Sequence, residues 1–234
     1  MDQVKIFAPA SVANVSCGFD VLGFCLEPVG DEMVIRKTES SGLKITKIVG
    51  QSLPLDVKKN VAGSAAEAML KAHPQKAGFE IEIYKNIKAG SGIGSSAASA
   101  AGAVFGINEL LGKPFTAHEL IAFAMEGEAL ASGSAHADNV APVLMGGITL
   151  VRSINPIDVI QLPTPKELTA VILHPKIELK TMHAREIIKK NVTMEKAIQQ
   201  WANLGAFVSA LFNEDYGLMS RSLKDEIIEP MRSL

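Results

Sequence analysis

The chain has 234 residues, of which 47% are hydrophobic, 21% charged and 5% aromatic. This composition is that of a folded globular protein and excludes collagen, a coiled coil or a disordered chain. Lysine and arginine number 23 against 25 acidic residues, so the net charge is -2 and no general positive field favours nucleic acid as a partner.

Two cysteines, Cys17 and Cys25, are too few for a secreted disulfide scaffold or a four-cysteine zinc site, and free thiols suit a reducing compartment. The first residues lack the basic and apolar regions of a signal peptide. The uncharged stretch 89–108 has the length of a bilayer span, but three glycines and three serines fall within its first eight residues. We therefore predict a cytosolic protein that does not bind a membrane.

Short runs rich in β-branched residues predict strands in the first third of the chain, at 4–7, 21–26, 33–37 and 43–49. The turn residues at 40–42 favour pairing of the last two as a hairpin. From Asn60, which can cap a helix, to Ala72 the residue content predicts a helix that stops before Pro74. Residues 78–86 alternate between apolar and polar side chains, which predicts a half-buried strand.

A glycine-serine loop at 90–96 precedes an alanine-rich run that predicts a helix ending at Gly112. Thr116 and Glu119 have the spacing of a capping box for a second helix, to about residue 130. Residues 148–152 predict a further strand. Strands that alternate with helices indicate an α+β or α/β architecture.

Two prolines, Pro163 and Pro165, mark a polar corner, and residues 168–173 predict a new strand beyond it. We therefore expect a domain boundary near residue 160, which divides the chain into 1–160 and 161–234. The second part is mainly helical. Its apolar residues recur at helical spacing and predict a buried stripe, made of Met194, Ile198, Trp201, Val208 and Phe212.

Residues 90–97, GSGIGSSA, lie between a predicted strand and a predicted helix. Glycines let a ligand approach the backbone, and the free N–H groups at a helix start attract an anion, so we interpret the segment as a phosphate-binding loop and not as a plain tight turn. The Walker-type P-loop is excluded, because no lysine follows Gly94. A dinucleotide loop fits the glycine spacing, but about ninety residues precede it here, so an NAD-dependent oxidoreductase is the weaker alternative.

Two further polar clusters occur in the sequence. Residues 9–20, PASVANVSCGFD, could clamp a small hydroxylated or amino-bearing substrate, although simple turn caps explain the same residues when they are taken alone. In the second cluster, 126–139, Glu128 lies near a predicted helix end, where a carboxylate could hold Mg²⁺ together with phosphate oxygens. His118, His136 and the cysteines form no pair with zinc-ligand spacing.

Together the three segments resemble the GHMP kinase superfamily and, within it, the homoserine kinase family. Residues 9–26 are similar to a first motif of that family, 90–99 to the superfamily's phosphate loop, and 136–142, HADNVAP, to a segment typical of homoserine kinases. The resemblance runs across most of the chain. It implies an α+β fold of two domains, the first like domain 2 of ribosomal protein S5 and the second ferredoxin-like.

The resemblance also implies an activity, which is transfer of the γ-phosphate of ATP to the hydroxyl of L-homoserine, with Mg²⁺ as the metal ion and a homodimer as the assembly. It places the phosphates at Gly90, Ser91, Gly92, Ile93, Gly94, Ser95 and Ser96. It places the metal at Ser96 and Glu128, adenine near Asn60, and a further phosphate contact at Lys85. Homoserine would be held by Asn14, Asp20, His136, Asn139, Arg185 and Arg232. The implied catalytic residues are Asn139, Glu128 and Thr181.

Some kinases of the superfamily have an aspartate base where this chain has Asn139. An amide does not accept a proton usefully near neutral pH, and a loose transition state needs little early deprotonation of the hydroxyl. We therefore hypothesise that the hydroxyl proton passes to phosphate, with Asp138 as a rival base.

The chain departs from the family pattern in three places. Ser16-Cys17 replaces the usual Gly-Pro, Ile93 stands where leucine or methionine is commoner, and a third glycine-rich motif is missing. We therefore expect a chain truncated at its C-terminus with an incomplete second domain. The alternatives are another small-molecule GHMP kinase and a non-catalytic nucleotide-binding fragment of the same fold.

Overall fold

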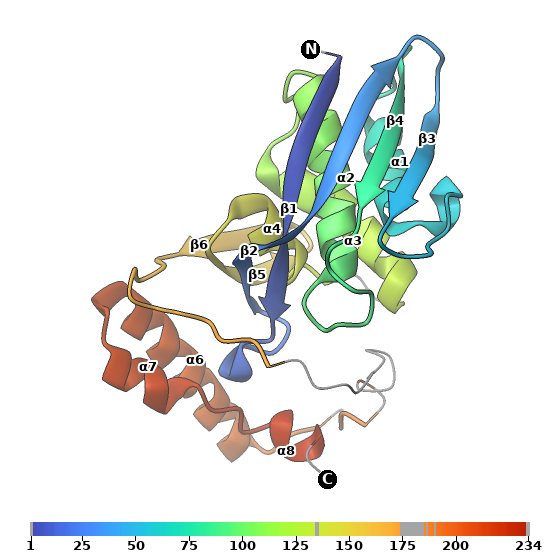
Figure 1. The fold of residues 1–234 in the computed structure, drawn as a ribbon. Helices are drawn as coiled ribbons and strands as arrows, with labels where there is room; N and C mark the ends of the chain where they lie inside the picture. The colour runs from blue at the N-terminus through green and yellow to red at the C-terminus, as the bar shows by residue number, and fades with distance from the viewer. Residues whose placement is uncertain (1, 134–135, 174–184, 186, 190, 233–234) are drawn as a thin grey trace.

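The computed structural model describes residues 2–133, 136–173, 185, 187–189 and 191–232, and combines one mixed sheet with helices (Figure 1). The strands are β1 (Gln3–Ala13), β2 (Leu22–Thr38), β3 (Leu43–Val49), β4 (Gly78–Tyr84), β5 (Ile148–Ile154) and β6 (Ile157–Leu162). The helices are α1 (Val61–Ala72), α2 (Ser95–Leu110), α3 (Ala117–Ser132), α4 (Val140–Met145), α6 (Met194–Asn213), α7 (Tyr216–Ser222) and α8 (Glu229–Arg232), with short 3₁₀ turns η1 (Ser16–Gly18) and η2 (Val57–Lys59).

Strand β2 is the centre of the sheet. The strand order is β3-β4-β2-β5-β6, and β1 pairs with β2 along its length. One half of β2 pairs with β4 and the other half with β5, so this single strand joins the two parts of the sheet. The strands predicted at 21–26 and 33–37 are therefore one strand, and its register against β1 shifts once, between Pro9 and Ala10.

The hairpin predicted at 40–42 is wrong. Strand β4 lies between β2 and β3, and β3 pairs with it in parallel, with α1 as the crossover between them. A parallel pair needs a helical crossover of this kind. The arrangement gives β4 a partner on both edges and buries its Phe79, Ile81 and Ile83, whereas a local hairpin would leave β4 with one partner.

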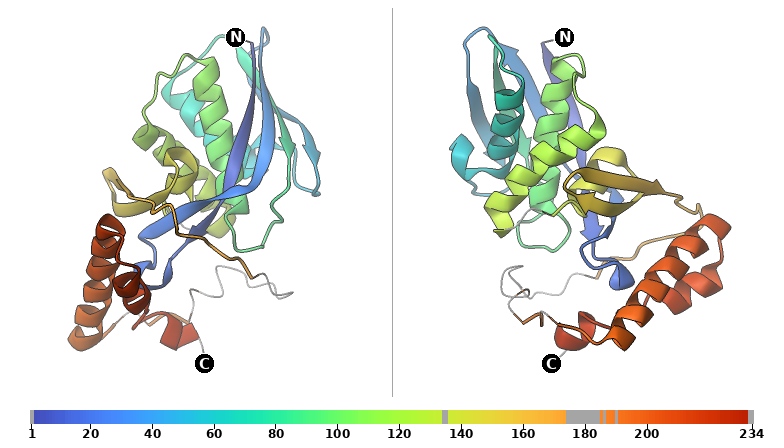
Figure 2. Two further views of the ribbon diagram at one scale, coloured as in Figure 1. Left: turned by 60° about the vertical axis from the view of Figure 1, so that its left-hand side comes forward. Right: turned by 180° about the vertical axis from the view of Figure 1, so that it is seen from behind.

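Helices α1, α2 and α3 cover one face of the sheet (Figure 2). The predicted caps are confirmed, because the Asn60 side chain accepts from the Ala62 N–H and Thr116 forms a capping box with Glu119. Small residues on α2 allow close approach to the sheet. A Cβ added to Gly106 would lie 2.5 Å from the Ile35 side chain. The core between sheet and helices is therefore thin at α2.

The apolar stripe predicted for the C-terminal helix is wrong for four of its five residues, and Val208 alone of the five packs against a buried cluster in the described structure. Helix α6 forms over Met194–Asn213, but Met194, Trp201 and Phe212 are 69%, 56% and 62% exposed. Its buried residues are Phe207, Ala210 and Leu211, which pack with residues of β2, β5, β6 and α7. Apolar residues therefore occur on two faces of this helix. In the described structure only the face with Phe207 and Leu211 packs against the rest of the protein.

The segment after β6 also differs from expectation. Residues 168–173 have no strand pairing in the structure, and Val171 and Leu173 are 80% and 88% exposed. A strand needs a neighbouring strand to pair its backbone groups, and residues 168–173 pair with none in the described structure. The predicted domain boundary at 160 falls inside β6, whose pairing with β5 continues to Leu162. Among the described residues, no helix is long and apolar enough to cross a membrane.

The packing of α3 gives a test of the fold. A Cβ on Gly127 would lie 2.5 Å from the Val61 carbonyl oxygen and 3.0 Å from the Ala100 Cβ. Gly127→Ala is therefore expected to lower the free energy of unfolding by about 1–3 kcal/mol, although alanine is the better helix former. Chemical denaturation measures the change.

The matched control is Gly205→Ala in α6, where a Cβ would meet no atom within 4 Å. This change is expected to stabilise the protein by about 0.5–1 kcal/mol, because only the helix propensity changes. A stabilising effect at both positions would contradict the close packing of α3 on α1.

Candidate active site

The loop between β4 and α2 contains three glycines in the left-handed region. Gly90, Gly92 and Gly94 have φ angles of 73°, 77° and 68°, which strain any residue with a Cβ. A Cβ on Gly94 would also lie 2.1 Å from the Ser11 Oγ on β1. Position 94 therefore needs glycine for two independent reasons, its own φ angle and the close approach of β1.

Helix α2 begins directly after this loop and, within the described residues, has no capping side chain. Helices α1, α3 and α6 are each capped by a side-chain oxygen. The first backbone bond into α2 runs from the Ala98 N–H to the Gly94 carbonyl, at 2.9 Å. The N–H groups at the start of a helix have no acceptor inside it, and together with the helix dipole they form a site for an anion.

A buried carboxyl lies beside the start of α2. Glu128 on α3 is 8% exposed, and its carboxyl hydrogen-bonds with Ser96. Burial raises the pKa of Glu128, and the hydrogen bond from Ser96 opposes this shift. The structure therefore brings together the two residues predicted to hold a metal ion, as two hard oxygen donors next to the anion site.

Asn139 connects the loop after α3 to β1. The Ser11 hydroxyl donates to the Asn139 Oδ1 at 2.9 Å, and the Asn139 Oδ1 also lies 3.1 Å from where a Cβ on Gly94 would be. Asn139 therefore borders the glycine loop at Gly94, which is predicted to bind phosphate.

Asp138, next to it, is almost fully buried, and its Oδ1 accepts from the Asn139 N–H at 3.1 Å. Burial raises the pKa of Asp138 to about 7, the charge of Asp20 adds to the shift, and Arg185 opposes it. Asp138 therefore titrates near neutral pH in the folded protein, unlike an ordinary aspartate.

A second polar cluster is centred on Asp20. The guanidinium of Arg185 donates two hydrogen bonds to the Asp20 carboxylate, at 3.0 and 2.5 Å. The Asn14 Oδ1 accepts from the Asp20 N–H at 3.1 Å, and the His136 Nδ1 lies 3.9 Å from the Asp20 carboxylate. Burial and the charge of Arg185 lower the pKa of His136, while Asp20 opposes the shift.

Two arginines from the C-terminal part of the chain meet at one aromatic ring. The guanidinium carbons of Arg185 and Arg232 lie 5.3 and 5.1 Å from the centre of the Phe19 ring, which is within cation–π distance. The backbone of this loop is strained, because Asn14, Ser16 and Asp20 all have positive φ. Residues predicted to bind one substrate are thus assembled from segments 165 residues apart.

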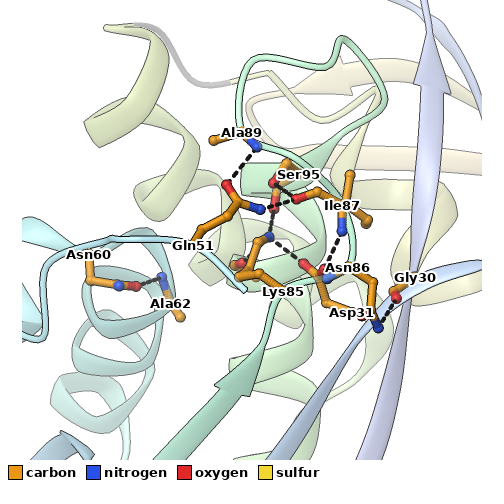
Figure 3. A network of polar contacts seen from close by, with 11 residues as sticks. Gly30, Asp31, Gln51, Asn60, Ala62, Lys85, Asn86, Ile87, Ala89 and Ser95 are labelled. Atoms are coloured by element: carbon orange, nitrogen blue, oxygen red, sulfur yellow. Dashed lines mark hydrogen bonds and ion pairs between the residues drawn. The ribbon is translucent and has the colours of Figure 1, made fainter. Parts of the chain in front are cut away.

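Lys85 points toward Asp31 and Ser95 (Figure 3). Its ammonium forms an ion pair with Asp31 and donates to the Ser95 carbonyl and the Ser99 hydroxyl, each at 2.9 Å. Burial lowers the pKa of Lys85, and Asp31 opposes the shift. This placement argues against the predicted phosphate contact and for a role within the protein.

Three further residues were predicted to belong to the site, namely Asn60, Ser91 and Thr181. Asn60 caps α1 and also donates to the Pro54 carbonyl at 2.8 Å, so its amide already has protein partners on both atoms. The Ser91 hydroxyl is buried and has no hydrogen-bond partner within the described structure. Thr181 lies outside the described residues.

Asp31, the partner of Lys85, was not predicted from the sequence, because a single aspartate inside a strand has no local signal.

Comparison with known proteins identifies the family of this chain. The model for the GHMP kinases N terminal domain matches residues 60–147. The homoserine kinase of Chloroherpeton thalassium is 46% identical over 245 residues, which cover all of this chain and 77% of that protein. The homoserine kinase of Methanococcus vannielii is 38% identical and is covered to 78%. The chain belongs to the homoserine kinase family of GHMP kinases.

Solved structures confirm the predicted fold. The crystal structure of homoserine kinase from Cytophaga hutchinsonii superposes with a TM-score of 0.93 at 48% identity, over all of this chain and 75% of that one. Phosphomevalonate kinase from Streptococcus pneumoniae shares the fold alone, with a TM-score of 0.69 at 12% identity. The family resemblance of the three sequence motifs and the GHMP kinase fold are thus both confirmed.

The buried carboxyl of Asp138 gives a pH-dependence test. Its pKa is about 7 in the folded protein against an ordinary 3.8, so between these values the folded state binds more protons than the unfolded state. The free energy of unfolding should therefore fall as pH rises through this range. Asp138→Asn removes this titration, so its stability relative to the original chain should increase between pH 5 and pH 8, by roughly 2.5 kcal/mol.

Denaturation at the two pH values measures this difference, and Asp215→Asn is the matched control. Asp215 is exposed and caps α7, a role that asparagine fills equally well. If the stability difference for Asp138→Asn were the same at pH 5 and pH 8, the raised pKa would be refuted.

Proposed function

We propose that this chain transfers the γ-phosphoryl group of ATP to the hydroxyl of L-homoserine, which yields ADP and O-phospho-L-homoserine for threonine biosynthesis. The observation that carries the proposal is the juxtaposition, in a member of the homoserine kinase family, of an uncapped helix start with a polar cluster suited to an amino acid. In the reaction the bond between the γ-phosphorus and the β,γ-bridging oxygen breaks, and a bond to the hydroxyl oxygen forms.

The nucleotide phosphates would lie against residues 90–96. The backbone N–H groups at the start of α2 are fixed donors, and they need no reorganisation when negative charge shifts on the phosphate oxygens. Ser96 and Glu128 fit a magnesium ion, since Mg²⁺ takes one or two protein ligands and the rest from phosphate and water. When bound, Mg²⁺ supplies neutralisation of phosphate charge.

The acceptor site would be the Asp20 cluster. A free amino acid carries both an ammonium and a carboxylate, and Asp20 with its bound Arg185 presents the complementary pair of charges. We infer that the substrate ammonium binds Asp20 and that its carboxylate binds Arg185 and Arg232, beside His136 and Asn14. This arrangement selects an amino acid over a sugar or a simple alcohol.

The hydroxyl proton needs a destination. Asn139 is an amide that Ser11 holds at the loop, and it can orient the hydroxyl but cannot accept its proton. We infer that the proton passes to a phosphate oxygen as the loose transition state develops. Asp138 is the rival base, because its pKa of about 7 suits proton transfer. The proposed catalytic role of Thr181, the adenine contact near Asn60, the homodimer and the cytosolic location stay predictions.

A coupled assay of ADP release with Mg-ATP tests the proposal. L-homoserine is compared with L-threonine, mevalonate, galactose and no acceptor, and turnover is expected with L-homoserine alone. In the same assay Asp138→Asn should keep turnover within about tenfold, because loss of a general base typically costs about 10² to 10⁴ in rate. ATP binding without turnover of any acceptor would overturn the kinase proposal in favour of a nucleotide-binding protein.

Substitution of Asp20 tests the acceptor site. Asp20→Asn removes the charge that would bind the ammonium, so the KM for homoserine should rise about 10- to 100-fold while the KM for ATP stays unchanged. Asp158→Asn is the matched control, because Asp158 also pairs with an arginine, Arg152, but on the surface of the β5-β6 hairpin. Equal rises in both KM values would contradict a specific role in acceptor binding.

A further inference from the structure

A buried ion pair between Asp31 and Lys85 contacts both ends of the loop 86–95, which contains the glycine-serine segment (Figure 3). The side chains of Asp31 on β2 and Lys85 at the end of β4 are 0% and 1% exposed. Besides Asp31, the Lys85 ammonium contacts the Ser95 carbonyl and the Ser99 hydroxyl in the first turns of α2. A lysine ammonium has three N–H donors, and three acceptors in the protein surround this one. Lys85 therefore holds the exit of the loop.

Asp31 holds the entrance of the same loop. Its Oδ1 accepts from the backbone N–H groups of Asn86 and Ile87, at 2.8 and 2.9 Å. The Asn86 amide also donates to the Gly30 carbonyl at 3.1 Å, on the same strand as Asp31. The two residues that lead from β4 into the loop are thus tied to the central strand of the sheet.

A third side chain supports the loop from its outer side. The Gln51 Nε2 donates to the Ile87 carbonyl at 2.6 Å, and its Oε1 accepts from the Ala89 N–H at 2.8 Å. The Ile87 carbonyl also accepts from the Ser95 hydroxyl at 2.9 Å, which connects the two ends of the loop directly. Unlike the ion pair, Gln51 is only partly buried.

We propose that Asp31, Gln51 and Lys85, called here the loop clamp, are positioning residues that hold loop 86–95 in the conformation in which the α2 N–H groups receive the nucleotide phosphates. Lys85 acts through Ser95 and Asp31 and does not touch phosphate. Glycine-rich segments have high conformational freedom, and without the clamp that freedom would be lost at each binding event. The proposal rests on the proposed function only in taking ATP as the ligand of this loop.

Substitution of Asp31 separates the clamp from a direct phosphate contact, because the two roles predict opposite signs. If Lys85 bound phosphate, Asp31→Asn would remove a competing carboxylate, and ATP would bind equally well or more tightly. If the clamp positions the loop, the Kd for Mg-ATP should rise about 10- to 100-fold, because an amide N–H would face the ammonium. Calorimetric titration of the full chain with Mg-ATP measures the Kd.

Lys85→Met should raise the Kd by a similar factor. The double variant Asp31→Asn with Lys85→Met should bind no worse than about the weaker single variant, because the two residues act as one unit. The KM for homoserine should stay unchanged in each variant. A general loss of structure would instead change the KM for homoserine as well as the KM for ATP. If the fold-increases in Kd of the two single variants multiplied in the double variant, Asp31 and Lys85 would act independently, and the proposal that they form one unit would be overturned.

Gln51→Ala tests the clamp without disturbing a buried charge. Its Kd for Mg-ATP should rise about 3- to 10-fold at an unchanged unfolding temperature. Gln161→Ala is the matched control, because Gln161 is exposed and likewise donates to backbone carbonyls, those of Met145 and Gly146, at 2.9 and 3.3 Å. Should the buried-pair variants fail to fold, Gln51→Ala decides, and an unchanged Kd for it would overturn the clamp.

The affinity measurement also distinguishes failure of the clamp from failure of the proposed function. A chain that binds Mg-ATP but phosphorylates no homoserine would overturn the proposed function, while the comparison of Kd values among the variants still decides on the clamp. A chain that binds no Mg-ATP would overturn both. Tighter ATP binding by Asp31→Asn would overturn the clamp alone and restore Lys85 as a phosphate contact.

Discussion

The close approach of α2 to the sheet is the constraint on which the site depends. Helix α2 is built largely from alanine, glycine and serine. A Cβ on Gly102 would lie 3.1 Å from side-chain atoms of Ala8 and Met33, and a Cβ on Gly106 would lie 2.5 Å from the Ile35 side chain. Because the helix lies so close, its first turn reaches Ser11 on β1 and Lys85 at the end of β4. A helix with larger side chains would move its N-terminus away from both strands, and the anion site would lose its support.

The candidate site has two parts, which present different kinds of polar group. Around the glycine loop the available donors are the backbone N–H groups at the start of α2, which carry partial charge and are fixed by the fold. Around Asp20 the groups are full charges on side chains, and the Asp20–Arg185 pair is only partly buried, with side-chain exposures of 30% and 28%. The first arrangement suits a ligand with spread negative charge, and the second suits a small zwitterion. Asn139 lies at the glycine loop. The neighbouring residue Asp138 lies close enough to Asp20 and Arg185 for their charges to shift its pKa.

The sequence predicted well where a local signal decides the structure. The caps at Asn60 and Thr116 and the alternation in β4 depend on residues within one element, and they were correct. The position of β3 was not predictable, because its partner β4 lies a whole helix further along the chain. Nor could the buried face of α6 be predicted, since Trp201 and Phe207 have similar hydrophobicity and only the packed neighbours select between them. Asp31 became visible only through its contacts with Lys85, Asn86 and Ile87.

Two hydrogen bonds of the candidate site join residues that are far apart in the sequence. Ser11 meets Asn139 across 128 residues, and Asp20 meets Arg185 across 165. The entropy lost on closing a loop grows with its length, and contacts of this kind raise the contact order of the fold, which slows folding. During synthesis from the N-terminus the strained 14–20 loop exists long before Arg185 leaves the ribosome. The Asp20–Arg185 pair is therefore completed only after the glycine loop and its supporting strands have been synthesised.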